Sequence, residues 1–316
     1  MGRDTLTRGR LAERAPWARA LQRDDLVARL VLPVIVSDAV LDRERVDGTG
    51  GLERLSITEL VRDARAAAST GLAGFLIFAA SDRKDELALL ASERDHIVAR
   101  AIHAVKDAAP DLAVATDVCV CAYTPHGQCV LFAEGQANVA GTLDRLAEIA
   151  AVHADAGADL LIPSGMLEGS VRALRAAVSS AGRPELPIAA MVKLESVLYP
   201  AHRIAVEAIP VTDRAVPLIA IDDRDGARTR AAREVAAGAD AIVLKPGLVT
   251  LDLVTRISET VDRPVVAFFT ADEHAFFTTS DDSRDLEAAE RETFGAARRA
   301  GADLMISYGA RSTTAE

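Results

Sequence analysis

The 316-residue chain carries 36 basic against 47 acidic residues, and the net charge of −11 argues against nucleic acid or an anionic membrane as a partner. Half of the residues are hydrophobic and the mean hydropathy is +0.15, so a large core is available. No apolar run approaches the roughly 20 residues that span a bilayer, and the first residues lack the apolar core of a secretory signal. We therefore expect a cytoplasmic enzyme, and at this length a single α/β barrel.

The first 24 residues differ from the rest of the chain in composition and show little periodicity. They contain Trp17 and six arginines, namely Arg3, Arg8, Arg10, Arg14, Arg19 and Arg23. We expect an N-terminal arm over residues 1–24 and a catalytic domain over residues 25–316. The sequence leaves open whether this arm is a frayed terminus or packs on a neighbouring subunit.

Eight short apolar runs follow the arm, and they are continuous rather than alternating, as strands buried on both faces should be. The runs are Val31–Val36, Gly74–Ala79, Ala113–Val120, Ala158–Pro163, Ile188–Lys193, Ala241–Lys245, Val265–Thr270 and Ala302–Tyr308. Stretches of helical period lie between most of them, including Ile57–Ala68, Glu93–Ala108, Val139–Ala154 and Leu286–Arg299. The alternation predicts a (β/α)8 TIM barrel.

One junction, Ala-Gly-Ala-Asp, occurs three times, at residues 156–159, 237–240 and 300–303. In each copy the glycine follows a helix and suits a left-handed C-cap, and a strand begins directly afterwards. An open doubly wound sheet is the alternative architecture. It is disfavoured because no Gly-x-Gly-x-x-Gly follows the early strands.

Two of the chain's four lysines, Lys193 and Lys245, end predicted strands that are neighbours in a barrel. Active sites of such barrels lie at the carboxyl ends of the strands, so the two amines should face one another there. Two ammonium groups about 6 Å apart repel by roughly 3 kcal/mol, or about two pKa units. Desolvation acts in the same direction. The pair is suited to form a Schiff base with a ketone, although each lysine alone could simply end a strand in solvent.

Three cysteines form the most specific signal in the chain: Cys119, Cys121 and Cys129. On a continuing strand the first two sulfurs would share one face, and the turn Thr124–Gly127 could return the third to meet them. Three thiolates suit zinc and leave a fourth position open, as in a catalytic site. We expect His126 to be exposed or beside the site rather than a ligand. The alternative is that the cysteines are small buried apolar side chains.

Further polar residues stand at strand ends and in one long connection. Asp117, Ser164 and Tyr308 lie at the ends of the third, fourth and eighth predicted strands. The connection from Leu194 to about Ala227 is long enough to be a lid or binding loop, and it carries Tyr199, Arg203 and Arg214.

Taken together, these residues resemble the porphobilinogen synthase (5-aminolevulinate dehydratase) family over about residues 8–310. The resemblance implies zinc on the cysteines of Thr116–Cys129, with Asp117 assisting proton transfer. Lys193 and Lys245 match the two Schiff-base lysines of the family. It also implies substrate binding by Arg203, Arg214 and Tyr308, which match carboxylate-binding residues, and by Ser164. The family joins two 5-aminolevulinate molecules into a pyrrole with loss of two waters. Its members are homo-oligomers, so we expect a dimer to octamer.

Four segments depart from the family pattern. Pro217-Leu218 replaces a Tyr-Gln pair, Gly165 replaces an acid, and Ala190-Met-Val192 replaces small hydroxylated residues. Ala271–His274 replaces Val-Ser-Gly-Glu-Tyr, so a serine that helps to hold a carboxylate is missing. Each lost hydrogen bond to a charged substrate costs about 1.5–3 kcal/mol. Three alternatives therefore stay open: a divergent paralogue acting on another aminoketone, a metal-free lysine aldolase, and a non-catalytic binding or assembly protein.

Overall fold

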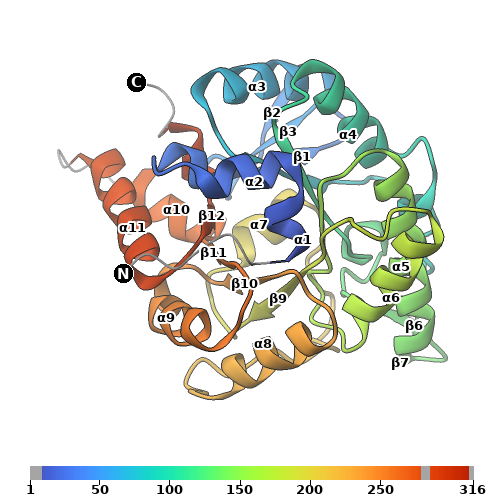
Figure 1. Cartoon of the computed structure of the whole chain (residues 1–316). Helices are drawn as coiled ribbons and strands as arrows, with labels where there is room; N and C mark the ends of the chain where they lie inside the picture. The colour runs from blue at the N-terminus through green and yellow to red at the C-terminus, as the bar shows by residue number, and fades with distance from the viewer. Residues whose placement is uncertain (1–8, 279–284, 313–316) are drawn as a thin grey trace.

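A ring of parallel strands surrounded by helices forms the body of the molecule (Figure 1). The computed structural model describes residues 9–278 and 285–312. The ring consists of β1 (Leu30–Val36), β4 (Gly74–Ala79), β5 (Ala113–Asp117), β8 (Leu160–Ile162), β9 (Ala189–Lys193), β10 (Ala241–Lys245), β11 (Val265–Phe268) and β12 (Leu304–Ile306). Neighbours follow the order β8-β5-β4-β1-β12-β11-β10-β9, and a parallel bridge between Leu161 and Ile188 joins the two ends. The predicted barrel is confirmed, and this closure excludes the open sheet.

Helices cover the outside of the ring. They are α3 (Ile57–Thr70), α4 (Ile97–Ala108), α5 (Val139–Asp155), α6 (Ser170–Ser180), α8 (Gly226–Ala236), α9 (Leu251–Thr260) and α11 (Leu286–Ala300). Shorter elements are α7 (Pro200–Ala205), α10 (Ala271–Thr278) and the strand pairs β2 (Arg43–Arg45) with β3 (Glu53–Leu55) and β6 (Leu131–Ala133) with β7 (Gln136–Asn138). None of the helices in the described ranges is both long and apolar enough to cross a bilayer.

Alternate residues of each strand enter two separate cores. In β1, Val31 and Ile35 pack inside the barrel, whereas Leu32 and Val34 pack against the surrounding helices. All seven residues of this strand are buried. Burial on both faces explains why the strands read as continuous apolar runs.

The repeated Ala-Gly-Ala-Asp junction connects the amino ends of adjacent strands. Its glycines, Gly157, Gly238 and Gly301, have φ of 98°, 102° and 108° and so take the predicted left-handed conformation. The Asp159 amide donates to the Val114 carbonyl at 2.7 Å, and the Asp159 carboxylate accepts from the Val114 amide at 3.0 Å. Asp240 and Asp303 make the same pair of bonds to Ile188 and Val265. Each aspartate therefore extends the hydrogen bonding of the sheet by one bond through its carboxylate.

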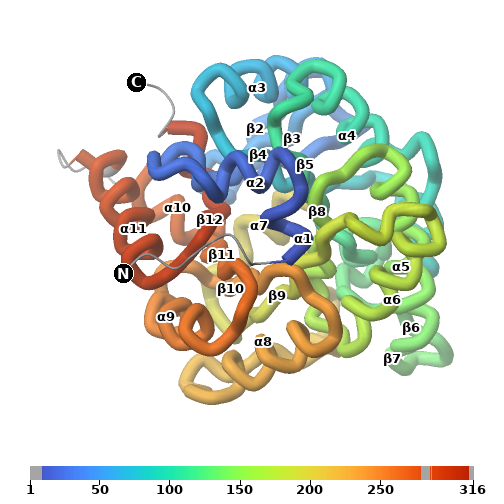
Figure 2. Tube along the Cα trace, in the orientation of Figure 1, coloured from blue at the N-terminus to red at the C-terminus, as the bar shows by residue number. Residues whose placement is uncertain are grey.

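The N-terminal segment crosses the amino end of the barrel as α1 (Arg10–Glu13) and α2 (Ala15–Gln22) (Figure 2). Trp17 is 1% exposed, and its Nε1 donates to the Asp159 carbonyl at 3.1 Å. Arg14 pairs with Asp159 at 2.9 Å, and Arg10 pairs with Asp240 at 3.1 Å. A frayed terminus therefore does not describe residues 10–22, which pack on their own barrel. The first eight residues lie outside the described ranges, and packing on a second subunit stays a prediction.

Candidate active site

The two strand-end lysines meet at the carboxyl end of the barrel. β9 and β10 pair in parallel with Lys193 directly opposite Lys245, so both side chains leave the same face of the sheet. They are 8% and 5% exposed, respectively. Each Nζ lies 5.6 Å from the centre of the Tyr199 ring. The structure therefore brings together the two amines that the sequence paired.

Aromatic rings surround these amines where a carboxylate would be the usual partner of a buried lysine. The Phe268 ring centre lies 3.8 Å from Lys245 Nζ. The Tyr199 hydroxyl donates to the carbonyls of Leu194 at 2.7 Å and Lys245 at 3.1 Å, which fixes that ring. Within residues 9–278 and 285–312, no carboxylate is within ion-pair distance of either Nζ. The site therefore holds the two amines without a carboxylate that would balance a positive charge on either of them.

Burial is the main cause of the altered basicity of both lysines. It lowers the pKa of Lys245 to about 7, and repulsion by Lys193 is the second cause. Burial also lowers the pKa of Lys193, with partial compensation by the negative Cys129 thiolate. The sequence provides a size only for the mutual repulsion, whereas in the structure burial is the larger of the two causes. Lys245 is therefore the amine that is half neutral near pH 7.

An acid stands next to the amines at the end of β5. Burial raises the pKa of Asp117 to about 6, although the Ser164 side chain acts to lower it by hydrogen bonding. One carboxylate oxygen, Asp117 Oδ1, has no hydrogen-bond partner in the described part of the chain. The Ser164 carbonyl accepts a bond of 3.4 Å from Lys193 Nζ. Asp117 can thus exchange a proton near neutral pH with a group that enters the site.

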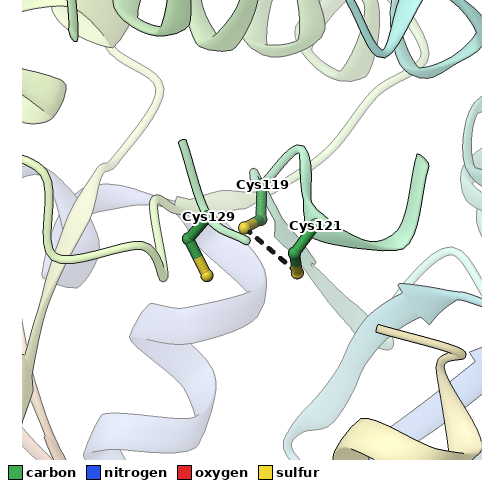
Figure 3. Close-up of side chains that lie close together, drawn as sticks. All are labelled: Cys119, Cys121 and Cys129. Carbon is green, nitrogen blue, oxygen red and sulfur yellow. Dashed lines mark hydrogen bonds between the residues drawn. The ribbon is translucent and has the colours of Figure 1, made fainter. Parts of the chain in front are cut away.

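The three cysteines converge (Figure 3), and they line the same cavity as this acid. Their sulfurs all lie within 4.8 Å of one another, and those of Cys119 and Cys121 are 3.3 Å apart. The expected continuation of the strand through these residues is wrong, because β5 ends at Asp117 and a short 3-10 turn covers Cys121–Tyr123. Beyond the rim the chain has no neighbouring strand to pair with, and it turns instead. The sulfurs meet through this turn rather than through strand alternation.

The third cysteine returns through the predicted turn Thr124–Gly127. The Gly127 amide donates to the Thr124 carbonyl at 3.3 Å, and Gly127 has φ of 64°. A side chain here would place Cβ 2.5 Å from the Ile209 carbonyl oxygen, so glycine is required. His126 Nδ1 accepts from the Gln128 amide at 3.1 Å, and this residue is not part of the sulfur cluster.

The two predicted lid arginines lie in different environments. Arg203, on α7, is 9% exposed and donates to the carbonyls of Gly127 and Ala208 at 3.0 Å each. Its Nη2 lies 3.6 Å from Cys129 Sγ, so this arginine forms a wall of the sulfur cluster. Arg214 is exposed at the mouth, with its guanidinium carbon 5.7 Å from the Tyr199 ring centre. Only Arg214 is in a position typical of a lid residue.

Sequence reasoning missed Gln128, which joins the cysteine turn to the lid. Its buried side chain donates to the carbonyls of Thr212 at 3.1 Å and Asp213 at 2.8 Å, and it accepts from the Ala215 amide at 3.3 Å. These partners are more than 80 residues away along the chain. A glutamine next to a candidate ligand was the only signal available in the sequence.

Sequence reasoning also missed His202, which precedes Arg203 on α7. His202 Nδ1 lies 3.0 Å from the Tyr308 hydroxyl, and its ring packs edge-on against Phe78 with centres 4.5 Å apart. His202 and Phe78 both line the same cavity as the lysines. Tyr308, expected to bind substrate, thus has a side-chain partner within the protein.

One partly enclosed cavity joins these groups. Its volume is about 40 Å³, enough for a few waters, and its lining includes Asp117, the three cysteines, both lysines and Arg203. The exposed stretch 209–214 is the part of the rim best placed to move when a substrate enters.

A sequence model of the family described as "Delta-aminolevulinic acid dehydratase" matches residues 6–315. The chain belongs to the delta-aminolevulinic acid dehydratase family. This is a family of lyases named as dehydratases rather than as aldolases, and this assignment replaces the lysine aldolase interpretation. Proteins named delta-aminolevulinic acid dehydratase include one from Methanothermobacter thermautotrophicus, 34% identical over 308 residues that cover 95% of this chain and 94% of that protein. Another, from Escherichia coli, is 31% identical over 311 residues, covering 96% of each.

A solved structure agrees with this assignment. Delta-aminolevulinic acid dehydratase from Toxoplasma gondii, in complex with the reaction product porphobilinogen, superposes with a TM-score of 0.88 at 27% identity. The superposition covers 99% of this chain and 91% of the other. The family assignment therefore rests on sequence and on fold along nearly the whole chain.

Proposed function

We propose that this dehydratase condenses two molecules of 5-aminolevulinate, or of a closely related aminoketone, into a pyrrole with loss of water, through Schiff bases on Lys245 and Lys193. One observation carries the proposal: two buried amines stand in register beside an acid and a cluster of three thiols. A non-catalytic binding protein would have no use for buried cations without carboxylate partners, because such charges reduce stability.

Lys245 is the first nucleophile. Its pKa of about 7 leaves a neutral amine at physiological pH, which adds to the ketone carbon of one substrate. The carbonyl oxygen leaves as water once it is protonated. Asp117, with a pKa of about 6, can supply that proton and later receive one from carbon. The walls formed by Phe268 and Tyr199 exclude water that would hydrolyse the imine. Lys193 holds the second ketone in the same way.

The cysteines fit a zinc ion. The neighbouring thiols, and then burial, raise the pKa of Cys119. The bond with Cys119 acts to lower the pKa of Cys121, but Cys129 and burial raise it overall. Bonds from these two thiols, and then Arg203, hold the pKa of Cys129 well below its usual range. One thiolate is thus already favoured, and a dication would favour the other two. Bound zinc would be a mild Lewis acid that positions the amine and carbonyl of one substrate.

Residues at the entrance and inside the cavity would bind the parts of the substrate other than its ketone. Arg214, exposed at the mouth, would receive a substrate carboxylate as segment 209–214 closes. Ser164 would contact substrate inside, and Tyr308 would act there through its hydrogen-bond partner His202. Arg203 would act chiefly through Cys129, because two of its bonds are made to backbone carbonyls. By the family resemblance we also propose a cytoplasmic homo-oligomer between dimer and octamer.

A related aminoketone is the second candidate substrate. It is favoured by Ala271 and Asp272, which follow β11 where the resemblance expects a serine for a substrate carboxylate. The Asp272 carboxylate accepts from the Ala201 amide at 3.2 Å, and it would repel a second carboxylate close by.

The test is incubation with 5-aminolevulinate and borohydride, followed by mass mapping of the modified lysine and an assay for pyrrole. We expect a reduced adduct at Lys245 or Lys193, together with pyrrole. An adduct without pyrrole would support the related aminoketone. Absence of any adduct with either kind of substrate would contradict the proposal.

A further inference from the structure

His202 is a polar group in the active-site cavity that the chemistry above does not use. It lies on α7, one residue before Arg203, and lines the cavity together with Lys245 and Phe268. Edge-on packing against Phe78 fixes one side of its ring, and the Tyr308 hydroxyl binds its Nδ1 at 3.0 Å. The ring is therefore held in one orientation, and within the described residues its Nε2 has no hydrogen-bond partner in the protein.

The proton arrangement of this pair follows from its surroundings. Burial, with Lys245, Arg203 and Lys193 nearby, holds the pKa of His202 well below its usual range, and Cys129 acts in the opposite direction. The imidazole is therefore neutral and carries one N–H. Burial raises the pKa of Tyr308, so its hydroxyl keeps its proton. His202 is the only hydrogen-bond partner of this hydroxyl among the described residues, so the phenol donates to Nδ1 and the imidazole proton is on Nε2.

A neutral N–H directed into this cavity suits an oxygen acceptor. The Phe78 ring that packs on His202 lies 6.5 Å from the Phe268 ring, which in turn lies 3.8 Å from Lys245 Nζ, so the histidine lies on the Lys245 side of the site. The residue after Thr270 is Ala271, which offers no hydroxyl for the end of a substrate bound there. The Tyr308 proton is already used on His202. Among the described residues, His202 therefore offers an unused neutral donor on the Lys245 side of the cavity.

We propose that His202 is a specificity-determining residue: its Nε2–H binds a carboxylate oxygen of the aminoketone held on Lys245, and Tyr308 is the positioning residue that fixes the tautomer. This inference rests on the proposed function and names the group that recognises the acidic end of that substrate. The neutral imidazole adds a hydrogen-bond donor without adding a positive charge beside the two lysines. A further cation there would disfavour protonation of the imine.

The experiment measures the ligand concentration that gives half-maximal borohydride-trapped adduct at Lys245, using two ligands. 5-Aminolevulinate has the acidic end, and aminoacetone carries the same aminoketone head without it. In His202→Phe, which keeps a ring to pack on Phe78, we expect the concentration for 5-aminolevulinate to rise about ten- to hundredfold. The value for aminoacetone should change less than about twofold. His202→Gln, which keeps an N–H near the Nε2 position, should restore most of the affinity.

Two controls separate this role from a structural one. His103→Phe, on the exposed face of α4, removes a histidine far from the cavity and should leave both values unchanged. Nitrogen-15 spectra of the histidines, with the His202 signal assigned by its loss in His202→Phe, should give the Nε2–H tautomer, and Tyr308→Phe should weaken that preference.

The outcomes are distinguishable. If wild type forms no adduct with either ligand, both the proposed function and this inference fail. If wild type forms the adduct but His202→Phe binds 5-aminolevulinate as tightly, or loses both ligands equally, the inference alone is overturned. A His202 spectrum with the proton on Nδ1 also overturns it.

Discussion

The two ends of the barrel bury charges to a similar extent but treat them in opposite ways. At the amino end, Asp159 and Asp240 are 1% and 2% exposed, and each meets two cationic side chains and a backbone amide. At the carboxyl end, Lys193 and Lys245 are buried against aromatic rings instead of carboxylates. Full pairing fixes the scaffold, whereas incomplete pairing leaves an amine that can lose its proton.

Two lysines of the same chain make the difference plain. Lys106 Nζ lies 2.9 Å from the Asp159 carboxylate and also binds the Pro110 carbonyl at 3.1 Å. Lys245 has a ring face at 3.8 Å and no such partner in the described ranges. Residue type alone therefore does not make a lysine reactive, and its surroundings decide. Each substitution proposed next changes the amino end or the carboxyl end of the barrel.

Replacing Lys245 by Met should cause the largest loss of activity, but it should leave the fold at least as stable as that of wild type at pH 7. Loss of the nucleophile should reduce turnover on the order of 10⁴-fold or more. The folded pKa of about 7 is below the unfolded value of about 10.4, so the folded chain binds fewer protons between these pH values. Wild-type stability therefore falls as pH drops from about 10 to 7, by up to a few kcal/mol, and Lys245→Met should lose this dependence.

Urea unfolding at pH 7 and pH 9 measures this effect. At pH 7 the variant should be at least as stable as wild type. If the variant unfolds more easily than wild type at pH 7, the Lys245 ammonium stabilises the fold. That result would contradict the view that charges at the carboxyl end of the barrel lack stabilising partners.

Replacing Asp159 by Ala should have the largest effect on stability. It leaves Arg14, Lys106 and the Val114 amide without their common acceptor, and removal of one partner of a buried ion pair costs about 3–5 kcal/mol. Adduct formation per folded chain should stay within about twofold of wild type, because the carboxyl end is unchanged. A large loss of adduct at full folding would show that the two ends are not independent.

Replacing Cys129 by Ser should weaken metal binding and spare the lysine chemistry. Wild type should bind one zinc per chain, measured by elemental analysis after dialysis. The affinity of the variant for zinc should fall by at least roughly 10- to 100-fold, which is the loss typical when a group that only supports a metal ligand is removed. Trapping of an adduct at Lys245 should survive chelation, whereas pyrrole formation should not. Full zinc content in the variant would contradict the assignment of this sulfur.

Replacing Gln128 by Ala should have the smallest effect, confined to the lid. It removes the hydrogen bonds of this side chain to segment 212–215, each contributing about 1 kcal/mol. Amide exchange in that segment should become faster, with little change in global stability. Gln136→Ala, at an exposed position of β7, is the matched control. Equal exchange in wild type and Gln128→Ala would show that the cysteine turn does not hold the lid.

The barrel and the lysine pair could be predicted because local pattern determines both. Continuous apolar runs identify strands buried on two faces, and a lysine at the end of each of two adjacent strands must lie at one rim. The meeting of the three sulfurs was predicted correctly but for the wrong reason, since the path through the 3-10 turn depends on where pairing stops.

What the sequence did not reveal depends on contacts between distant loops. Gln128 and His202 find their partners more than 80 and 100 residues away, respectively, and neither belongs to a motif of charged or repeated residues. The burial of Arg203 likewise depends on how α7 folds back over the cysteine turn. Helical or strand periodicity carries no information about such contacts.

The most direct test of the account is a carbon-13 NMR titration of the lysine side chains, which is feasible because the chain has only four lysines. The account predicts one signal, absent in Lys245→Met, that titrates with a midpoint near pH 7. If the Lys245 signal instead titrates at or above its usual value near 10.4, the unpaired amine at the carboxyl end is not the reactive group that we describe.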